Sequence, residues 1–319
     1  MIRLDETTGN SVATAIADER RRMGSSATGM VLTLLVLASE ETQADAVQAA
    51  SLAAREHPMR ILVFVARTGR EPAHLDAEIS VGGDQGPGEL AVLRLHGKLA
   101  HHAGSVAIPL LLPDTPVVAW WPGTAPEDLA DDPIGRHAVR RITDASAVTR
   151  PVRSLDVRQR GYQPGDTDLA WTRLTPWRSI LAAAFDQPVG PIISIEVVCE
   201  SSNASGPLLA SWLHRQLGAP VRSFSAKAPG ISEVRIVGEL GEIAINRADG
   251  VKATLSRTGR SPATVALPRR SLAELLAEEL RRLDPDEIYA EALMGLPAVA
   301  PATRPQAKPT TARPSRRTS

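Results

Sequence analysis

The chain has 319 residues, of which 43% are hydrophobic and 23% charged, the composition of a globular protein with room for about two domains. Its formal net charge is zero, but residues 297–319 carry five basic side chains and no acidic one, which leaves the rest of the chain at −5. That balance argues against a broad nucleic-acid surface on the folded part, where a strong basic excess would be expected. The single cysteine, Cys199, excludes an internal disulfide framework and a multi-cysteine metal site.

The first half of the chain predicts an α/β domain. A helix near residues 11–23 comes first, and apolar strands at residues 30–38 and 60–66 then flank a helix at residues 39–56. This strand–helix–strand unit implies a parallel pair of strands with a right-handed crossover. The remaining elements expected in this domain are two strands, a helix and a buried strand, at residues 77–81, 89–96, 98–110 and 116–121.

An export signal is an alternative explanation of the N-terminal region. Three arginines at residues 20–22 precede the apolar run of residues 30–38. The run is too short to span a bilayer, and an acidic amphipathic segment precedes it instead of a simple basic leader. We therefore expect a cytoplasmic protein without a membrane segment, and the single cysteine fits a reducing compartment.

The second half predicts another α/β domain, which starts at residue 166. Residues 149–165 mix Arg, Pro, Gly and Gln without periodicity, so we expect a connector there. Ser271 and Glu274 have the spacing of a capping box at the start of a late helix. Helices are expected in this half at residues 176–185, 206–217, 271–283 and 285–293. Strands are expected at residues 192–199, 234–237, 242–246 and 251–256.

The sequence thus predicts two α/β domains with mixed sheets, at residues 1–165 and 166–296, and a tail at residues 297–319. The first domain includes the basic connector. The tail is rich in Pro and Arg and lacks apolar residues that could stabilise an ordered state, so we expect it to be disordered.

Residues 166–186, DTDLAWTRLTPWRSILAAAFD, concentrate two of the five tryptophans beside two arginines at the start of a helix. Thr175 is a good N-cap, and Pro176 suits the first helical position, where no N–H is needed. The apolar face of this helix recurs at a spacing of three and four residues and is expected to be buried. It consists of Trp177, Ile180, Leu181, Ala184 and Phe185.

Trp and Arg are the residue types that most often carry binding energy at protein interfaces. The candidate partner-binding residues of this segment are therefore Trp171, Arg173, Trp177 and Arg178. The alternative is that both tryptophans are packing residues and both arginines are solvated.

Two further regions are candidate contact surfaces. Trp120 and Trp121 end a strand just before a Pro-Gly pair, and adjacent strand residues face opposite sides of a sheet. We therefore expect one indole to be buried and its neighbour to point outward or into an interdomain cleft, available for a partner. The second region, residues 136–160, holds seven arginines and only two acidic residues. Its Arg136, Arg140 and Arg141 are a candidate anion or partner surface, and a solvated connector is the alternative.

No motif of the sequence positions a catalytic residue, a cofactor or a metal. The turn ASEETQ at residues 38–43 has no glycine and two carboxylates, which would repel phosphate where a dinucleotide-binding turn would cradle it. The Gly-rich loop of residues 82–88 lacks the ending of a phosphate-binding loop and is expected to be a hairpin turn. His96, His101 and His102 lack the spacing of a helical metal site. Cys199 alternates with core residues and is expected to be a small core hydrophobe.

Five segments taken together resemble the OpcA family, the glucose-6-phosphate dehydrogenase assembly or effector proteins. The hallmark of that family is similar to WTRLTPWR followed by a small-residue helix ending in FD. The other similar segments are EHPMRILVFVA, IPLLLPDTPVVAWWPG, RRITDAS and ASWLHRQLG, at residues 56–66, 108–123, 140–146 and 210–218. The resemblance covers nearly everything except the last two dozen residues.

The resemblance implies a non-catalytic partner that binds glucose-6-phosphate dehydrogenase, promotes its active oligomer and raises its affinity for glucose 6-phosphate. Such a protein supports NADPH production in the oxidative pentose phosphate pathway and needs no cofactor or nucleic acid. Photosynthetic relatives are tied to thioredoxin control, but a chain with one cysteine cannot form an intramolecular disulfide switch. The competing hypotheses are an enzyme or sensor that binds a sugar phosphate or nucleotide through the arginine-rich stretch, and an adaptor that binds nucleic acid through its basic tail.

Overall fold

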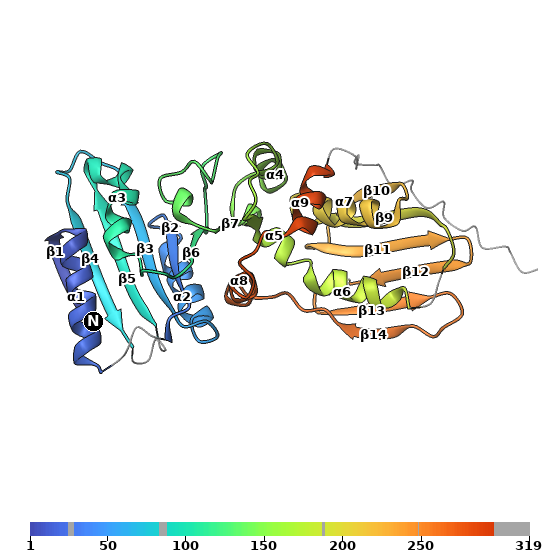
Figure 1. Ribbon diagram of the computed structural model, residues 1–319. Helices are drawn as coiled ribbons and strands as arrows, with labels where there is room; N and C mark the ends of the chain where they lie inside the picture. Colours follow the sequence, from blue (N-terminus) through green and yellow to red (C-terminus); the bar gives the residue numbers. More distant parts are fainter. Residues whose placement is uncertain (25–28, 83–87, 187–188, 248, 297–319) are drawn as a thin grey trace, which may run out of the picture.

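The computed structural model describes residues 1–24, 29–82, 88–186, 189–247 and 249–296. The tail expected to be disordered and most of the Gly-rich loop lie outside these residues. The described part forms two mixed sheets side by side, each packed against helices, which confirms the predicted fold class (Figure 1). None of its helices is long and apolar enough to cross a membrane.

The first sheet has eight strands in the order β1-β4-β5-β3-β2-β6-β7-β8. The strands from β5 to β8 in this order run parallel, whereas β4 pairs antiparallel with β5, and β1 antiparallel with β4. The central strands are apolar along most of their length, as parallel strands covered on both faces require. The bounds are Ile2–Thr7 (β1), Leu32–Ala38 (β2), Met59–Arg67 (β3), Leu75–Val81 (β4), Glu89–His96 (β5), Val117–Trp121 (β6), Arg140–Thr143 (β7) and Asp166–Asp168 (β8).

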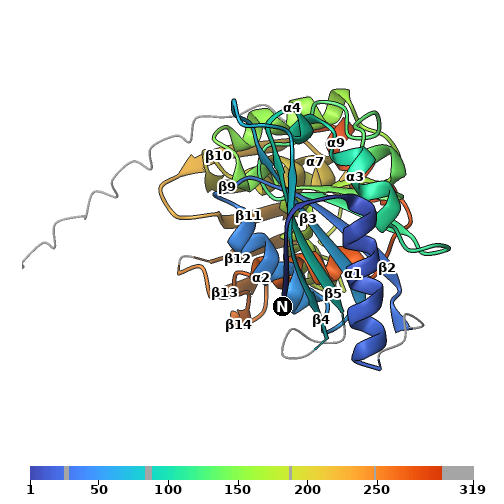
Figure 2. The same cartoon turned by 90° about the vertical axis from the view of Figure 1, so that its left-hand side faces the viewer.

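Helices cover both faces of this sheet. Helix α1 (Gly9–Arg22) packs on one face and α2 (Gln43–Ala53) on the other (Figure 2). The strand–helix–strand unit predicted from the sequence is β2, α2 and β3, and its two strands pair in parallel. The single helix expected at residues 98–110 is instead three short helical segments. Pro109, which has no N–H for a continuing helix, lies in the last of them. The segments are η3 (Gly97–His101), α3 (Ala103–Ala107) and η4 (Ile108–Leu110).

The expected connector at residues 149–165 is largely a helix, so that prediction was wrong. Helix α4 (Pro151–Arg160) starts with Pro151 in its first turn. Among its ten residues only Leu155 and Arg158 are buried, one of them charged. A helix that buries only two side chains, one of them charged, shows no apolar periodicity in its sequence.

The second sheet has six strands in the order β10-β9-β11-β12-β13-β14. Strand β10 is parallel to β9, and the other neighbours are antiparallel. The strands are Ile192–Glu200 (β9), Val221–Ala226 (β10), Ile231–Gly238 (β11), Gly241–Asn246 (β12), Lys252–Arg257 (β13) and Ala263–Ala266 (β14). A single apolar cluster joins this sheet to helices α5 (Leu169–Thr172), α6 (Thr175–Ala184), α7 (Ser205–Leu217) and α9 (Glu287–Met294).

Helix α8 (Leu272–Leu280) follows the second sheet in the chain but packs on the first (Figure 1). Its Leu275, Leu276 and Leu280 lie in the same apolar cluster as the alanines of α2. The predicted capping box at its start is present, with Ser271 and Glu274 each bonded to the backbone N–H of the other. Residues 166–168 and 272–280 thus belong to the first sheet and its helices, although the second domain was expected to begin at residue 166.

Candidate functional site

The WTRLTPWR segment forms α5 and α6 at the junction of the two sheets (Figure 1). Asp168 caps α5 by accepting a hydrogen bond of 2.8 Å from the N–H of Ala170. Thr175 does not cap α6 as expected: Leu174 occupies the N-cap, and the Thr175 hydroxyl donates to Glu278 of α8 at 2.6 Å. The prediction failed because a carboxylate from a distant part of the chain takes this hydroxyl.

Both tryptophans of the segment are buried. Trp171 is 1% exposed, and its indole N–H donates to Asp286 just before α9 at 2.8 Å. The guanidinium of Arg178 lies 3.9 Å from the centre of the Trp171 ring, a cation–π contact. Trp177 is in the second sheet's core, as its helical spacing predicted. These indoles connect α5 and α6 to the rest of the protein and present little surface to solvent.

Glu279 of α8 joins the segment to the first sheet. It is buried and accepts hydrogen bonds from the guanidinium of Arg140 on β7 and, at 2.6 Å, from the hydroxyl of Thr172. Arg140 also donates to the carbonyl of Asp284 at 2.8 Å. A buried carboxylate is therefore shared by a strand of the first sheet and by the helix pair that packs on the second.

Arg173 forms the other charged contact of the junction. Its guanidinium donates to both carboxylate oxygens of Asp144, at 2.7 and 2.8 Å, in the bidentate geometry that arginine favours. Burial lowers the pKa of Arg173, but the hydrogen bond and charge of Asp144 outweigh it and leave the pKa raised. We name Arg140, Asp144, Thr172, Arg173 and Glu279 the junction cluster.

Trp120 and Trp121 are both buried, at 0% and 3% exposure, so the prediction that one points outward was wrong. They do face opposite sides of the sheet: Trp120 belongs to the apolar cluster under α2 and α8, and Trp121 to the cluster under α1. Strand β6 is central and covered on both faces, so alternation exposes neither residue.

The basic stretch separates into exposed and buried arginines. Arg136 is exposed, whereas Arg140 and Arg141 are 4% and 7% exposed and lie on β7. Arg141 donates to Asp166 of the neighbouring strand at 2.5 Å and to two backbone carbonyls. Two of the three arginines expected to form an anion surface are therefore neutralised inside the protein.

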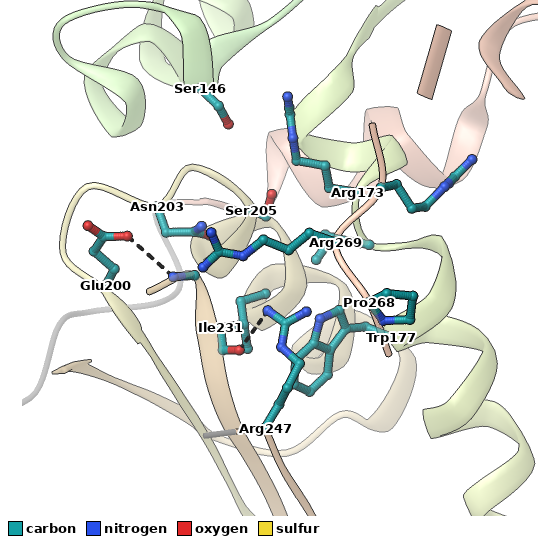
Figure 3. Close-up of a pocket in the computed structure, with 13 residues that line it drawn as sticks. Ser146, Arg173, Trp177, Glu200, Asn203, Ser205, Ile231, Arg247, Pro268 and Arg269 are labelled. Carbon is teal, nitrogen blue, oxygen red and sulfur yellow. Dashed lines mark hydrogen bonds between the residues drawn. The ribbon is translucent and has the colours of Figure 1, made fainter. Parts of the chain in front are cut away.

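A cavity of about 240 Å³ lies between α6, the start of α7 and the ends of β11 and β12 (Figure 3). We name it the arginine pocket. It is bordered by Trp177 and by four arginines, and its other polar side chains are Ser146, Glu200, Asn203 and Ser205. The four arginines are Arg173, Arg247, Arg269 and Arg270.

Two arginines of this pocket are without a carboxylate partner among the described residues, namely Arg247 and Arg269, while Arg270 pairs with Glu278 at 2.5 Å. Arg247 lies over the ring of Trp177 and donates to the carbonyls of Leu267 and Ile231. Burial, and then the positive charge of Arg269, lower the pKa of Arg247. Even with the carboxylate of Glu200 in the lining, these two guanidinium groups leave the pocket with an excess of positive charge, which favours an anion.

Sequence reasoning missed the arginine pocket. Arg247 follows β12 and Arg269 precedes α8, and neither belongs to an arginine-rich stretch or a known motif. The only local signal was the pair of arginines at residues 269–270, directly before the capping box.

A larger cavity, of about 640 Å³, lies at the carboxyl ends of β2, β3 and β6, where α/β folds commonly bind ligands. Its rim includes Glu41, and the neighbouring Glu40 forms an ion pair with Arg67. The ASEETQ turn thus presents one carboxylate that is unpaired among the described residues, that of Glu41, at this position, and a carboxylate there repels a phosphate group.

Asp168 is a buried carboxylate with a displaced pKa. Burial raises its pKa to about 6, and the nearby carboxylate of Asp144 adds to the rise. Hydrogen bonds from the hydroxyl of Thr143 and from the N–H groups of Ala170 and Ala145 oppose it. This group therefore titrates in the folded protein at a higher pH than in the unfolded chain, where its pKa is about 3.9.

The D168N variant is expected to change how stability depends on pH. Between pH 4 and pH 6 the folded wild type binds more protons at Asp168 than the unfolded chain does, so stability falls as pH rises, by up to about 2–3 kcal/mol. The amide of the variant does not titrate. Urea unfolding at pH 4 and pH 7 should show the stability advantage of the wild type over D168N shrinking by this amount, and a constant advantage would contradict the account.

Cys199 lies in the core of the second domain, as expected for a small core hydrophobe. Burial, with a smaller contribution from Glu200, raises the pKa of its thiol to about 11. A thiol with so high a pKa is a poor nucleophile near neutral pH.

Sequence comparison matches two family domains in order along the chain. Residues 50–160 match the "Glucose-6-phosphate dehydrogenase subunit N-terminal domain", and residues 164–293 match the corresponding "C-terminal domain". The chain is also 30% identical, over 155 residues, to the OxPP cycle protein OpcA of Synechocystis sp.. That match covers 46% of this chain and spans about a third, 32%, of the relative's length.

Similar solved structures are found among oxidoreductases. A 3-ketoreductase from Actinomadura kijaniata, KijD10, is 11% identical with a TM-score of 0.45, and the match covers 86% of this chain and all of that one. A levoglucosan dehydrogenase is 11% identical with a TM-score of 0.43, over 85% of this chain and 91% of that one. Similarity at this level carries no functional argument. The two matched domains and the Synechocystis relative together establish that the chain belongs to the OpcA family.

Proposed function

We propose that this protein is a non-catalytic cytoplasmic assembly factor of glucose-6-phosphate dehydrogenase, which promotes the active oligomer of the enzyme and raises its affinity for glucose 6-phosphate. The observation that carries the proposal is that both halves of the chain match family domains described as those of a subunit of this dehydrogenase. The protein would thereby increase NADPH production in the oxidative pentose phosphate pathway.

The geometry of the 640 Å³ cavity supports a non-catalytic role. The cavity occupies the position where a dinucleotide would lie in an α/β fold, yet the turn after β2 contributes Glu41 to it and has no glycine. A carboxylate there disfavours the pyrophosphate of NADP. The proposal therefore assigns cofactor binding and catalysis to the dehydrogenase and recognition to this chain.

The junction cluster supports a role as a rigid binding partner. An effector shifts its target toward the active state only by binding that state more tightly, typically by 1–3 kcal/mol. A partner whose two sheets are fixed relative to each other loses less conformational entropy on binding. We infer that Trp171, Arg173, Trp177 and Arg178 support the interface from beneath by fixing α5 and α6 between the two sheets, and that exposed side chains such as Arg136 make direct contacts.

Sedimentation of the purified proteins tests the assembly role. The dehydrogenase of the same organism is run alone, with this protein, and with this protein after heat denaturation as the control. We expect a saturable complex whose mass exceeds the sum of one dehydrogenase protomer and one copy of this protein. Two species that sediment independently at micromolar concentration, both folded, would contradict it.

An anion sensor is the second candidate function, and the arginine pocket is the observation that favours it. Arg247, Arg269 and the amide of Asn203 surround a cavity whose other arginines are already paired. The Oδ1 atom of Asn203 accepts the N–H of Gly206 at 2.9 Å, which leaves its amide N–H₂ group to donate. Such a set of donors suits the phosphate group of a sugar phosphate or nucleotide. Arg247 and Arg269 lie outside residues 136–160, the arginine-rich stretch that the sequence suggested for anion binding.

The R269A variant is expected to weaken anion binding about tenfold or more, because a charge-assisted hydrogen bond contributes roughly 1.5–3 kcal/mol. Arg269 is exposed, so the variant should fold normally. Calorimetry with glucose 6-phosphate and with NADPH measures the effect, and R260A, which removes an exposed arginine from the β13–β14 turn, is the control. Absence of heat with either ligand would remove the sensor hypothesis and leave the assembly role intact.

A further inference from the structure

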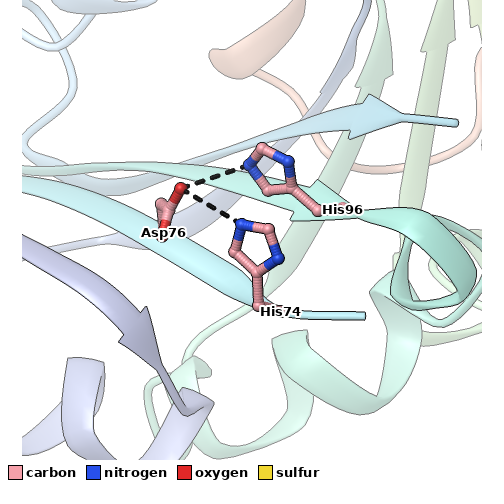
Figure 4. A group of neighbouring side chains, drawn as sticks. All are labelled: His74, Asp76 and His96. Atoms are coloured by element: carbon pink, nitrogen blue, oxygen red, sulfur yellow. Dashed lines mark ion pairs between the residues drawn. The ribbon is translucent and has the colours of Figure 1, made fainter. Parts of the chain in front are cut away.

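Two histidines and an aspartate converge at the outer part of the first sheet (Figure 4). His74 directly precedes β4, Asp76 lies on β4, and His96 ends β5. The backbone N–H of His96 donates to the carbonyl of His74 at 3.0 Å, so strand pairing places the two rings side by side. Residues two apart on a strand share a face, which brings Asp76 to the same group.

Each of the three side chains places one ligand atom within 4.8 Å of the other two. Nε2 of His96 lies 3.2 Å, and Nε2 of His74 3.7 Å, from the same carboxylate oxygen, Oδ2 of Asp76. The second oxygen of Asp76, Oδ1, accepts the backbone N–H of Glu6 at 3.0 Å. The carboxylate is therefore anchored through one oxygen and presents the other to the histidines.

Hydrogen bonds on the far side of each ring define the tautomers. Nδ1 of His74 lies 2.9 Å from the carbonyl oxygen of Pro72, and a carbonyl can only accept, so this nitrogen carries a proton. Nδ1 of His96 lies 2.9 Å from a carboxylate oxygen of Glu71 and donates to it in the same way. In the neutral form of each ring, Nε2 then presents a lone pair toward Asp76.

The ligand atoms of the two rings are held close together. The rings stack with their centroids 4.0 Å apart, and both Nε2 atoms face the same oxygen of Asp76. Nε2 of His96 is buried and, within the described residues, forms no hydrogen bond despite its nearness to Asp76. A cation bound among the three atoms would give this buried nitrogen a partner.

We propose that His74, Asp76 and His96 bind a divalent transition-metal cation, with zinc as the first candidate. Two metal–ligand bonds of about 2.0–2.1 Å at a tetrahedral angle separate their ligand atoms by roughly 3.3 Å, and the observed 3.2 and 3.7 Å lie on either side of this value. His74 is partly exposed, so a small rotation of its side chain can bring Nε2 closer to the metal. Three protein ligands leave a fourth position for water.

The surroundings have the features of a metal site. A carboxylate, Glu71, and a backbone carbonyl, that of Pro72, hold the two rings by their distal nitrogens, the arrangement that orients metal-ligating histidines. The nearby arginines do not oppose a cation with free charge, because Arg67 pairs with Glu40 and Arg94 with Glu78. Sequence reasoning did not find the site because it searched for helical spacing, whereas these ligands meet across two strands.

Titration of the chelator-treated full-length protein with cobalt(II) tests the proposal, because tetrahedral cobalt absorbs visible light and replaces zinc at such sites. One equivalent is expected to bind with visible absorption, and one equivalent of zinc should displace it. H74A and D76A should weaken binding at least tenfold, and E71A, which removes only the acceptor of the outer hydrogen bond, about tenfold. H137A, which removes an exposed histidine elsewhere, should bind as the wild type does.

The buried His96 is left unchanged in these variants so that folding is retained, and circular dichroism verifies it. Failure of the folded wild type to bind a stoichiometric equivalent of cobalt or zinc would overturn the proposal. Equal affinity in the wild type, H74A and D76A would overturn it too, since the metal would then bind elsewhere. Neither outcome depends on whether the protein assembles with the dehydrogenase.

Discussion

The E279A variant is expected to lose about 3–5 kcal/mol of unfolding free energy, because removing one partner of a buried ion pair leaves the other charge uncompensated. The side chains of Glu279 and Arg140 are only 6% and 4% exposed. Without the carboxylate, the guanidinium of Arg140 keeps the carbonyl of Asp284, and the hydroxyl of Thr172 loses its acceptor. Equilibrium unfolding in urea, monitored by tryptophan fluorescence, measures the loss.

A surface ion pair supplies the matched control for this variant. Glu56 pairs with Arg281 of the residues following α8 at 2.8 Å, but both side chains are more than half exposed. The E56A variant should therefore lose less than about 1 kcal/mol. A double variant, R140M/E279L, which replaces the pair with apolar side chains, should recover part of the stability lost in E279A. Equal losses in E279A and E56A would contradict the role given to Glu279.

The R173A variant is expected to lose about 3–4 kcal/mol, the second largest effect. Asp144 is 5% exposed and would lose both hydrogen bonds from the guanidinium, while the carboxylate of Asp168 nearby adds to the unfavourable charge. The sequence made Arg173 a candidate partner-binding residue. Its bidentate pairing with Asp144 predicts that the variant loses stability even in the absence of a partner protein.

Two further variants separate charge from geometry at this position. R173K keeps the positive charge but cannot form the bidentate pair, so it should lose less stability than R173A and remain less stable than the wild type. R153A removes an exposed arginine from α4 and should change stability by no more than about 0.5 kcal/mol. If R173A unfolds at the same urea concentration as the wild type, the pairing with Asp144 contributes nothing and Arg173 is free to act as a contact residue.

The parallel part of the first sheet could be predicted because its strands are continuous apolar runs. Strands β2 and β3 bury nearly every residue, and α2 between them buries four alanines. Strand β7, RRIT, could not be predicted in the same way, since it starts with two arginines that are normally exposed. They are buried there because Glu279 and Asp166 neutralise them, and neither pairing is visible in the local sequence.

Periodicity predicted the burial of Trp177 correctly but failed at the Trp120–Trp121 pair. A helix face is apolar because one side meets the core, so the spacing around Trp177 was sufficient. Alternation along a strand distinguishes an inner from an outer face only when one face meets water. Strand β6 lies between α1 on one side and α2 with α8 on the other. Helix α8 comes from a distant part of the chain, so the local sequence around β6 could not show that it covers this face.

The candidate sites depend on contacts between segments that are far apart in the chain. The arginine pocket combines residues from α6, the end of β12 and the loop before α8, and the histidine pair meets across β4 and β5. Composition shows that these residues exist, but only strand pairing and helix packing bring them together. The proposed function, by contrast, rests on the similarity of whole segments to a known family and does not require the geometry of a site.

The central claim is that this chain activates glucose-6-phosphate dehydrogenase by assembling with it. The most direct measurement titrates the purified protein into the dehydrogenase of the same organism, following rate against glucose 6-phosphate while light scattering reports mass. We expect a saturable fall in the apparent KM that parallels a rise in mass, with a coupling of about 5- to 150-fold. No change in either KM or mass, with both proteins folded, would contradict it.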